Sequence, residues 1–157
     1  MKKYRHRGGN NYTIQMTFAA NDAEHIYGLG QESGNTLDKK NTAYELYQCN
    51  TKASIPVIYS SLGYGFFWNN PSVGRCSFDK KRSVWVADSA VQADYLVFTG
   101  ENPQDVMYRY GLLTGFSPDM PEWVCGFWQS KLRYETQEEV RKLHESIKKK
   151  ICPWMRL

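Results

Sequence analysis

Alternating apolar and polar residues along the first hundred positions predict a series of short β-strands. In residues 12–18, Tyr12, Ile14, Met16 and Phe18 alternate with polar residues, a period of two that is typical of a half-buried strand. Further apolar runs, separated by turn-forming residues about every ten positions, lie at 26–31, 44–47, 55–60, 64–68, 83–87 and 93–98. Short strands with this spacing predict an antiparallel β-sandwich.

The pattern changes to a helical period near residue 100. Asn102 is a good helix-capping residue, and the proline that follows it suits the first turn of a helix. Val106, Tyr110 and Leu113 then fall on one face of a helix. We therefore predict a helix that begins at residue 103 and ends before Gly115.

The last forty residues have a different organisation. Residues 116–122 contain two prolines and predict a linker, and the apolar run 123–130 predicts a strand. Thr136 and Glu139 form a capping box, which predicts the start of a helix over residues 137–149. The apolar stripe of this helix consists of Val140, Leu143 and Ile147. A strand that leads directly into a helix is the repeating unit of a (β/α)8 barrel, which needs about 250 residues.

Composition and charge narrow the class of protein. The chain has 157 residues, of which 41% are hydrophobic and 15% aromatic, and this composition argues against disorder. Aromatic residues pack well in β-rich cores, and their faces also stack on sugar rings. The net charge of +4 comes largely from short basic clusters near the two ends, with no basic stripe between them. We therefore expect no binding to nucleic acid.

Cysteine and histidine spacing gives no sign of a metal or cofactor. The four cysteines are far apart, whereas zinc sites use closely spaced pairs, and the three histidines are scattered. The basic N-terminus leads into Gly8 and Gly9 without the apolar core of a signal peptide. No run approaches the eighteen or so apolar residues of a membrane span. We therefore expect a cytoplasmic protein with reduced thiols, no cofactor and no membrane partner.

Eight short motifs occur in one order between residues 26 and 150. They are Tyr27-Gly28-Leu29-Gly30-Gln31, Leu37-Asp38-Lys39-Lys40, Gln48-Cys49-Asn50-Thr51, Ile55-Pro56, Gly63-Tyr64-Gly65-Phe66-Phe67-Trp68-Asn69-Asn70-Pro71, Asp94-Tyr95, Leu113-Thr114-Gly115 and Gly126-Phe127-Trp128-Gln129-Ser130-Lys131-Leu132-Arg133-Tyr134. In this order the chain resembles glycoside hydrolase family 31, the α-glucosidase and α-xylosidase family. The form of the last motif resembles the bacterial branch of the family.

The resemblance implies a two-part architecture in a mainly β protein. Residues 1–117 would be the later part of the N-terminal, galactose-mutarotase-like β-sandwich. Residues 118–157 would be the first strand and helix of an incomplete (β/α)8 barrel, with Ile151-Cys152-Pro153 as the entry to its second strand. In the family the sandwich begins further upstream and the barrel continues further, so the resemblance implies a chain cut at both ends. A truncated or frame-shifted reading frame would explain this.

The resemblance also implies the chemistry of the complete enzyme. Family members are retaining glycosidases, in which two carboxylates lie about 5–5.5 Å apart across the scissile bond. In the family both are aspartates on later barrel strands, and none of the 16 acidic residues here matches their motifs. We therefore predict no catalytic residue in this chain. The expected substrate of the complete enzyme is an α-linked glucoside or xyloside.

Three residues are candidates for contact with sugar in the complete enzyme. Asn50 matches a sandwich loop that reaches over the active site, where it would hydrogen-bond a hydroxyl; the alternative is a turn asparagine that closes a strand. Trp128 and Arg133 lie at the C-terminal end of the first barrel strand, the end where barrel active sites are built. The alternatives are barrel core for Trp128 and a solvated loop cation for Arg133. Trp68 and Trp85 are expected in the sandwich core.

Two other functions remain open from the sequence. The high aromatic content is compatible with a non-catalytic carbohydrate-binding module. The apolar faces that a missing barrel would leave uncovered are compatible with a protein-interaction module. If the strand 123–130 lacks barrel neighbours, its free backbone N–H and C=O groups form an open edge. We therefore expect residues 119–157 to be loosely held and the chain to self-associate.

Overall fold

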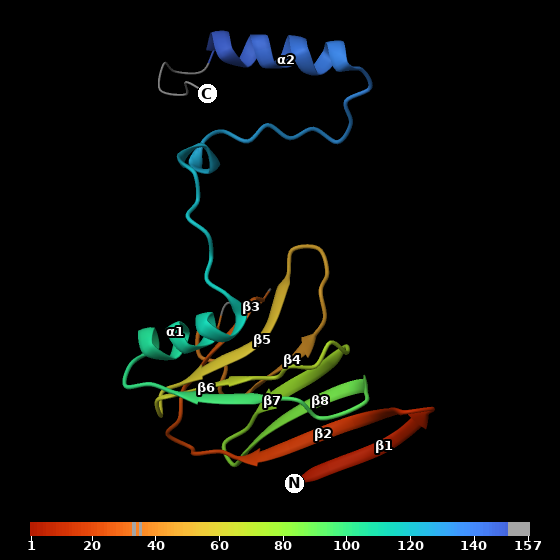
Figure 1. Ribbon diagram of the computed structural model, residues 1–157, viewed down its shortest axis with the longest axis vertical. Helices are drawn as coiled ribbons and strands as arrows, with labels where there is room; N and C mark the ends of the chain where they lie inside the picture. The colour runs from red at the N-terminus through yellow and green to blue at the C-terminus, as the bar shows by residue number, and fades with distance from the viewer. Residues whose placement is uncertain (33, 35, 151–157) are drawn as a thin grey trace. The chain divides into compact units, whose positions relative to one another are not determined.

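The computed structural model describes residues 1–32, 34 and 36–150 (Figure 1). These residues belong to two compact units, Met1–Phe116 and Ser117–Leu157. The predicted entry to a second barrel strand, at 151–153, lies outside the described residues.

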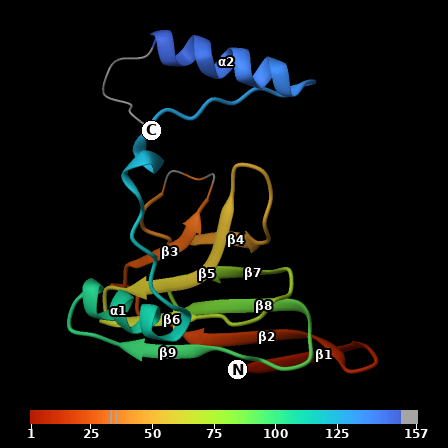
Figure 2. The same ribbon diagram turned by 45° about the horizontal axis from the view of Figure 1, so that its top comes forward.

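Two antiparallel sheets build the first unit (Figures 1 and 2). Along the first sheet the order is β1 (Lys2–Gly8), β2 (Asn11–Ala19), β8 (Arg82–Ala90), β7 (Gly74–Phe78) and β4 (Thr42–Leu46). Along the second it is β3 (Ile26–Gln31), β5 (Ala53–Ser60), β6 (Tyr64–Phe67) and β9 (Leu96–Thr99). Every strand pairing is antiparallel, and the predicted mainly β sandwich is confirmed.

The core lies between the two sheets and is rich in aromatic rings. Trp68 and Trp85 are each 1% exposed, as predicted for core residues. Phe66 of the second sheet packs on Trp85 of the first, with ring centroids 4.9 Å apart. Burying a large apolar side chain of this kind contributes about 1.5–3 kcal/mol. Facing aromatic residues from both sheets therefore hold the sandwich together.

Two strands of the first sheet, β1 and β7, are not predicted by the hydrophobic pattern. Every residue of β1 is exposed, and its largely basic sequence shows no apolar alternation. It forms because its backbone pairs with β2, from Lys2 opposite Met16 to Gly8 opposite Asn11. Strand β7 is short, and its burial depends on its place between β8 and β4. Both strands exist through pairing with neighbours rather than through their own pattern.

Helix α1 (Pro103–Thr114) ends the first unit and is capped as predicted. The Asn102 side-chain oxygen accepts a hydrogen bond from the Asp105 N–H at 2.9 Å. Val106 is buried, and Tyr110 packs on it and on Phe98 of β9. Leu113, which the pattern places on the buried face, is instead 53% exposed. The buried face of α1 is therefore narrower than its apolar pattern suggests.

The second unit does not contain the predicted strand at 123–130. Residues Glu122–Cys125 form a 3-10 turn, and 126–136 have no regular secondary structure. A strand needs a neighbour for its backbone N–H and C=O groups, and no described residue pairs with this segment. The barrel assignment of the segment stays a prediction.

Helix α2 (Gln137–Lys150) is confirmed where the capping box predicts it. The Glu139 N–H donates to the Thr136 hydroxyl at 3.2 Å. No side chain described in residues 117–149 is buried, so the described part of this unit has no core of its own. Among the described residues, no helix is long and apolar enough to cross a membrane.

Candidate functional site

The loop between β4 and β5 carries Asn50, the predicted sugar contact of the sandwich. It joins a strand of the first sheet to a strand of the second and projects beyond the strands (Figures 1 and 2). The Lys52 N–H donates to the Cys49 carbonyl at 3.2 Å and closes a four-residue turn, with Thr51 in the left-handed region at φ 67°. Asn50 is exposed within this turn. It is therefore a turn asparagine whose exposure leaves it open to a ligand.

The side chain of Gln48 closes the base of this loop. Its Nε2 donates to the Ser54 carbonyl at 2.6 Å, and its Oε1 accepts from the Ser54 N–H at 2.9 Å. The amide thus takes the place of a neighbouring strand for one residue of β5. This pairing lies outside the sequence prediction, although Gln48 belongs to one of the motifs.

A buried ion pair anchors the C-terminal side of the loop. Lys52 Nζ lies 3.0 Å from Glu32 Oε2, and the two side chains are only 8% and 5% exposed. The ammonium also donates to the Glu45 carbonyl at 2.5 Å and lies 4.6 Å from the centre of the Tyr47 ring. Glu32 Oε1 is buried and accepts no hydrogen bond from the described residues. Lys52 is therefore the main partner of this carboxylate.

The same ion pair lies near a buried thiol. Burial raises the pKa of Cys76 to about 12, with a further contribution from the negative charge of Glu32. Cys76 is 2% exposed in the sandwich core. At neutral pH it is a protonated, inaccessible thiol and not a nucleophile.

Two adjoining hollows lie on the sandwich, and the first of them is at the base of the loop. One, of about 570 Å³, is lined by residues that include Tyr47, Gln48 and Asn70. The other, of about 830 Å³, shares Asn70 with it and extends to Asp94. The side-chain amide of Asn69 donates to the Asp94 carboxylate, and that of Asn70 donates to the Asp94 backbone carbonyl, both at 2.7 Å. Amide and carboxylate groups beside an exposed tyrosine are the kinds of groups that bind sugar hydroxyls and ring faces.

Trp128 and Arg133, the other two predicted contacts, belong to the second unit. Trp128 is 65% exposed; its indole N–H donates to the Val124 carbonyl at 2.8 Å, and its ring lies 5.7 Å from that of Trp123. Arg133 is exposed and makes no ion pair with the described residues. Asn50 lies in the first unit, so the three residues do not form one site within either unit.

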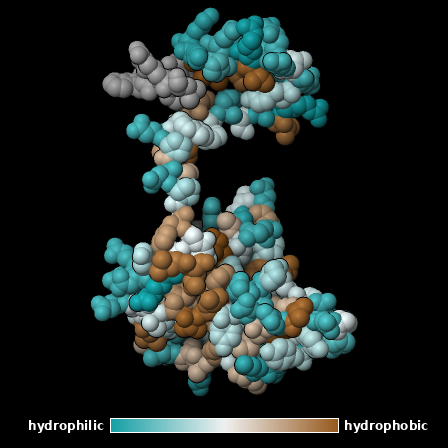
Figure 3. Space-filling model, in the orientation of Figure 1, coloured by the Kyte–Doolittle hydropathy of each residue, from teal (hydrophilic) through white to brown (hydrophobic). Residues whose placement is uncertain are grey.

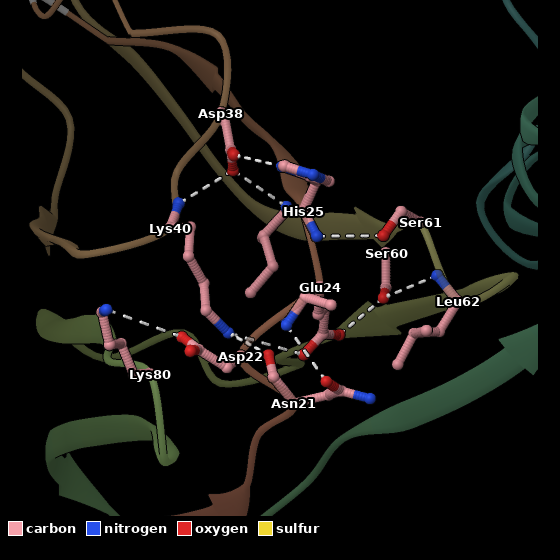
Figure 4. Close-up of polar contacts among 12 residues, drawn as sticks. Asn21, Asp22, Glu24, His25, Asp38, Lys40, Ser60, Ser61, Leu62 and Lys80 are labelled. Atoms are coloured by element: carbon pink, nitrogen blue, oxygen red, sulfur yellow. Dashed lines mark hydrogen bonds and ion pairs between the residues drawn. The ribbon is translucent and has the colours of Figure 1, made fainter.

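A buried polar cluster sits where the chain enters β3 (Figure 4). Glu24 is 2% exposed, and its Oε1 accepts from the Ser60 hydroxyl and from the Tyr64 hydroxyl, both at 2.5 Å. Lys40 Nζ lies 3.9 Å from the other carboxylate oxygen. Burial and the Glu24 carboxylate together raise the pKa of Tyr64 to about 12. The contacts join the loop before β3 to β5 and β6 and are structural.

A second acidic group lies beside this cluster. Asp38 contacts the His25 ring at 2.6 Å and accepts the backbone N–H groups of Ile26 at 3.1 Å and Lys40 at 3.0 Å (Figure 4). Burial opposes ionisation of Asp38, but these hydrogen bonds outweigh it and lower the pKa of the carboxyl. Asp38 therefore holds the loop onto β3. Within the described part of the chain, no three His, Cys, Asp or Glu side chains gather closely enough to hold a metal ion.

Comparison with known proteins identifies the family. Residues 2–79 match the glycosyl hydrolase 31 N-terminal galactose mutarotase-like domain. The chain belongs to glycoside hydrolase family 31. A family 31 glucosidase of Pseudescherichia vulneris, itself uncharacterized, is 42% identical over 84% of this chain and 25% of its own length. An α-xylosidase of Saccharolobus solfataricus is 35% identical over 92% of this chain and 21% of its own length.

Solved structures of family members have the same fold. A family 31 α-xylosidase from a soil metagenome, crystallised with xylose, has 36% sequence identity and a TM-score of 0.85 over 94% of this chain. A xylosidase from Aspergillus niger has 32% identity and a TM-score of 0.84 over 93% of it. This chain covers only 22% and 21% of those proteins. It therefore spans between a fifth and a quarter of the length of these relatives.

Proposed function

We propose that this chain is a fragment of a retaining α-glycosidase that acts on α-xylosides or α-glucosides, made up of part of the N-terminal sandwich and the start of the catalytic barrel. The observation that carries the proposal is the likeness to an α-xylosidase at 36% identity and a TM-score of 0.85 over 94% of the chain. That protein was crystallised with xylose. The comparisons do not favour the alternative of a separate, non-catalytic module.

In this proposal the chain supplies contacts to the sugar and no catalytic group. Retention needs two carboxylates about 5–5.5 Å apart on either side of the sugar. The carboxylates of Glu24, Glu32 and Asp38 instead hold lysine, tyrosine, serine, histidine and backbone groups within the sandwich. Asn50 would bind a sugar hydroxyl from the β4–β5 loop. Trp128 and Arg133 would supply an aromatic face and a cation from the second unit.

A chimeric enzyme tests this role directly. Residues 1–150 of this chain replace the matching region of the soil-metagenome α-xylosidase, and turnover of aryl α-xyloside and aryl α-glucoside is measured. We expect the chimera to be active. In it, Asn50→Ala should raise KM about five- to tenfold, because the sugar loses one hydrogen bond. Asn10→Ala, in the exposed β1–β2 turn, is the matched control. A folded but inactive chimera, or equal KM values for the two variants, would contradict the proposal.

The 157-residue chain alone is expected to be inactive. Purified protein is assayed with the same two substrates, and no turnover above background is the expected result. Turnover that survives purification and is abolished by replacing an acidic residue of this chain would show that it holds a catalytic group.

Partners and compartment belong to the same proposal. An α-linked oligosaccharide is the proposed partner of the complete enzyme, and the cytoplasm its compartment, since Cys49, Cys76 and Cys125 are free thiols. The predicted self-association cannot arise from an open strand edge at 123–130, because no strand forms there. The exposed apolar side chains of α1 offer a different surface for it (Figure 3).

A further inference from the structure

The β4–β5 loop has little backbone support of its own. It passes from one sheet to the other, so strand pairing stops at its ends, and the isolated bridge between Cys49 and Lys52 is the sole ladder contact described within it. Thr51 has a positive φ of 67°, which a β-branched residue rarely adopts. A strained turn persists only where its surroundings hold it. Side chains must therefore supply the restraint.

Lys52 and Glu32 meet that requirement. Lys52 directly follows the strained Thr51, and its ammonium contacts Glu32, next to the end of β3, at 3.0 Å. It also contacts the Glu45 carbonyl of β4 at 2.5 Å. One buried cation thus ties the loop to strands of both sheets. Lys80, by contrast, has a side chain that is 68% exposed, and its ion-pair partner Asp22 lies 4.0 Å away.

Loss of either Glu32 or Lys52 should affect the β4–β5 loop and not the rest of the sandwich. Glu32 Oε1 has no hydrogen bond among the described residues, so removal of Lys52 leaves a buried carboxylate without compensation. The loop then has to move to bring water to the charge. Gln48 holds only the base of the loop, through Ser54, and does not reach the turn at Thr51.

We propose that Glu32 and Lys52 are positioning residues that hold Asn50 in its sugar-binding conformation. The sugar contact itself rests on the proposed function, whereas the restraint of the loop does not. Neither residue touches the sugar in this proposal. Both act through the turn that Lys52 closes with Cys49.

Amide hydrogen exchange in the full 157-residue chain tests the restraint. In Lys52→Met, we expect the Lys52-position and Ser54 amides to exchange at least about tenfold faster, while β8 amides stay within about twofold. Lys52→Arg should restore slow exchange, because a guanidinium reaches the same partners. Glu32→Gln keeps the side-chain shape and should accelerate the same two amides.

Lys39→Met is the matched control. Lys39 is also a buried lysine, 6% exposed, which lies 5.0 Å from the Tyr44 ring and donates to the Thr36 carbonyl. Its loss should leave the Lys52 and Ser54 amides unchanged. Unchanged loop exchange in both Lys52→Met and Glu32→Gln would overturn the restraint. Equal acceleration across β8, or the same loop effect in Lys39→Met, would also overturn it.

Kinetics of the chimera separate this inference from the proposed function. Lys52→Met should raise KM for the aryl α-xyloside with kcat unchanged, and Lys52→Arg should restore it. If loop exchange accelerates while KM stays constant, the restraint stands and the sugar contact of Asn50 is wrong. If Asn50→Ala raises KM while Lys52→Met changes neither exchange nor KM, the positioning role is wrong and the proposed function stands.

Discussion

Replacing Glu24 with leucine should destabilise the sandwich strongly. The Glu24 carboxylate is 2% exposed and accepts a hydrogen bond of 2.5 Å from Ser60 (Figure 4). It accepts a second hydrogen bond, also of 2.5 Å, from the Tyr64 hydroxyl. Leucine fills similar space but accepts neither. It therefore leaves the fully buried Ser60 hydroxyl and the part-buried Tyr64 hydroxyl without their acceptor.

The contacts of Glu24 determine how far Glu24→Leu should lower the free energy of unfolding. A hydrogen bond to a charged group contributes about 1.5–3 kcal/mol, so losing two gives about 3–6 kcal/mol. Lys40 loses its ion pair with Glu24 but keeps the Asn21 carbonyl at 2.6 Å, which limits its share. Apolar burial by leucine offsets part of the loss. We expect the free energy of unfolding to fall by about 3–4 kcal/mol, a large fraction of the 5–15 kcal/mol typical of a domain.

Urea unfolding followed by near-ultraviolet circular dichroism measures this change, because Trp68 and Trp85 lie in the sandwich core. A double-mutant cycle of Glu24→Leu with Tyr64→Phe should give a coupling energy of about 1.5–2 kcal/mol. Asp22→Leu is the control; the Asp22 side chain is 70% exposed, and its change should stay within about 0.5 kcal/mol. A loss below about 1 kcal/mol for Glu24→Leu, or strict additivity, would refute the reasoning.

Three further predictions concern other parts of the sandwich. Tyr64 has a pKa of about 12 in the folded chain, above its ordinary value of 10, so stability should be lost as pH rises from 10 through 12. The loss is about 1 kcal/mol after discounting for partial exposure, and Tyr64→Phe should abolish it in unfolding curves across that range. Leu112, on α1, is 62% exposed, and Leu112→Lys should weaken self-association and so lower the weight-average mass in sedimentation, whereas Leu37→Lys, in a loop, should not. Equal masses for the two variants would exclude α1 as the self-association surface. Gly74→Ala places a methyl group 1.9 Å from the Val86 carbonyl oxygen and should cost about 2–3 kcal/mol in thermal unfolding; an unchanged melting temperature would mean that β7 shifts freely.

Structural features that are set by residues close to one another in the sequence can be predicted from the sequence of this chain alone. The alternation of Ile14 and Met16 predicts β2, since side chains on a strand point to opposite faces. Asn102 and Thr136 predict the helix starts, because their side chains bond to N–H groups three residues along. The position of Asn50 in a turn also follows from local preference.

Other features depend on residues far apart in the chain, and only the tertiary structure decides them. Strand β1 has no apolar pattern and forms because β2 offers its backbone a partner, whereas the apolar run 123–130 has none and stays irregular. The anchor of the β4–β5 loop joins Glu32 to Lys52, which the sequence leaves as two unrelated polar residues. The physical reason is the same in each case. Local dihedral and capping preferences act within a few residues, whereas strand pairing and burial of charge need partners that only the folded chain brings into contact.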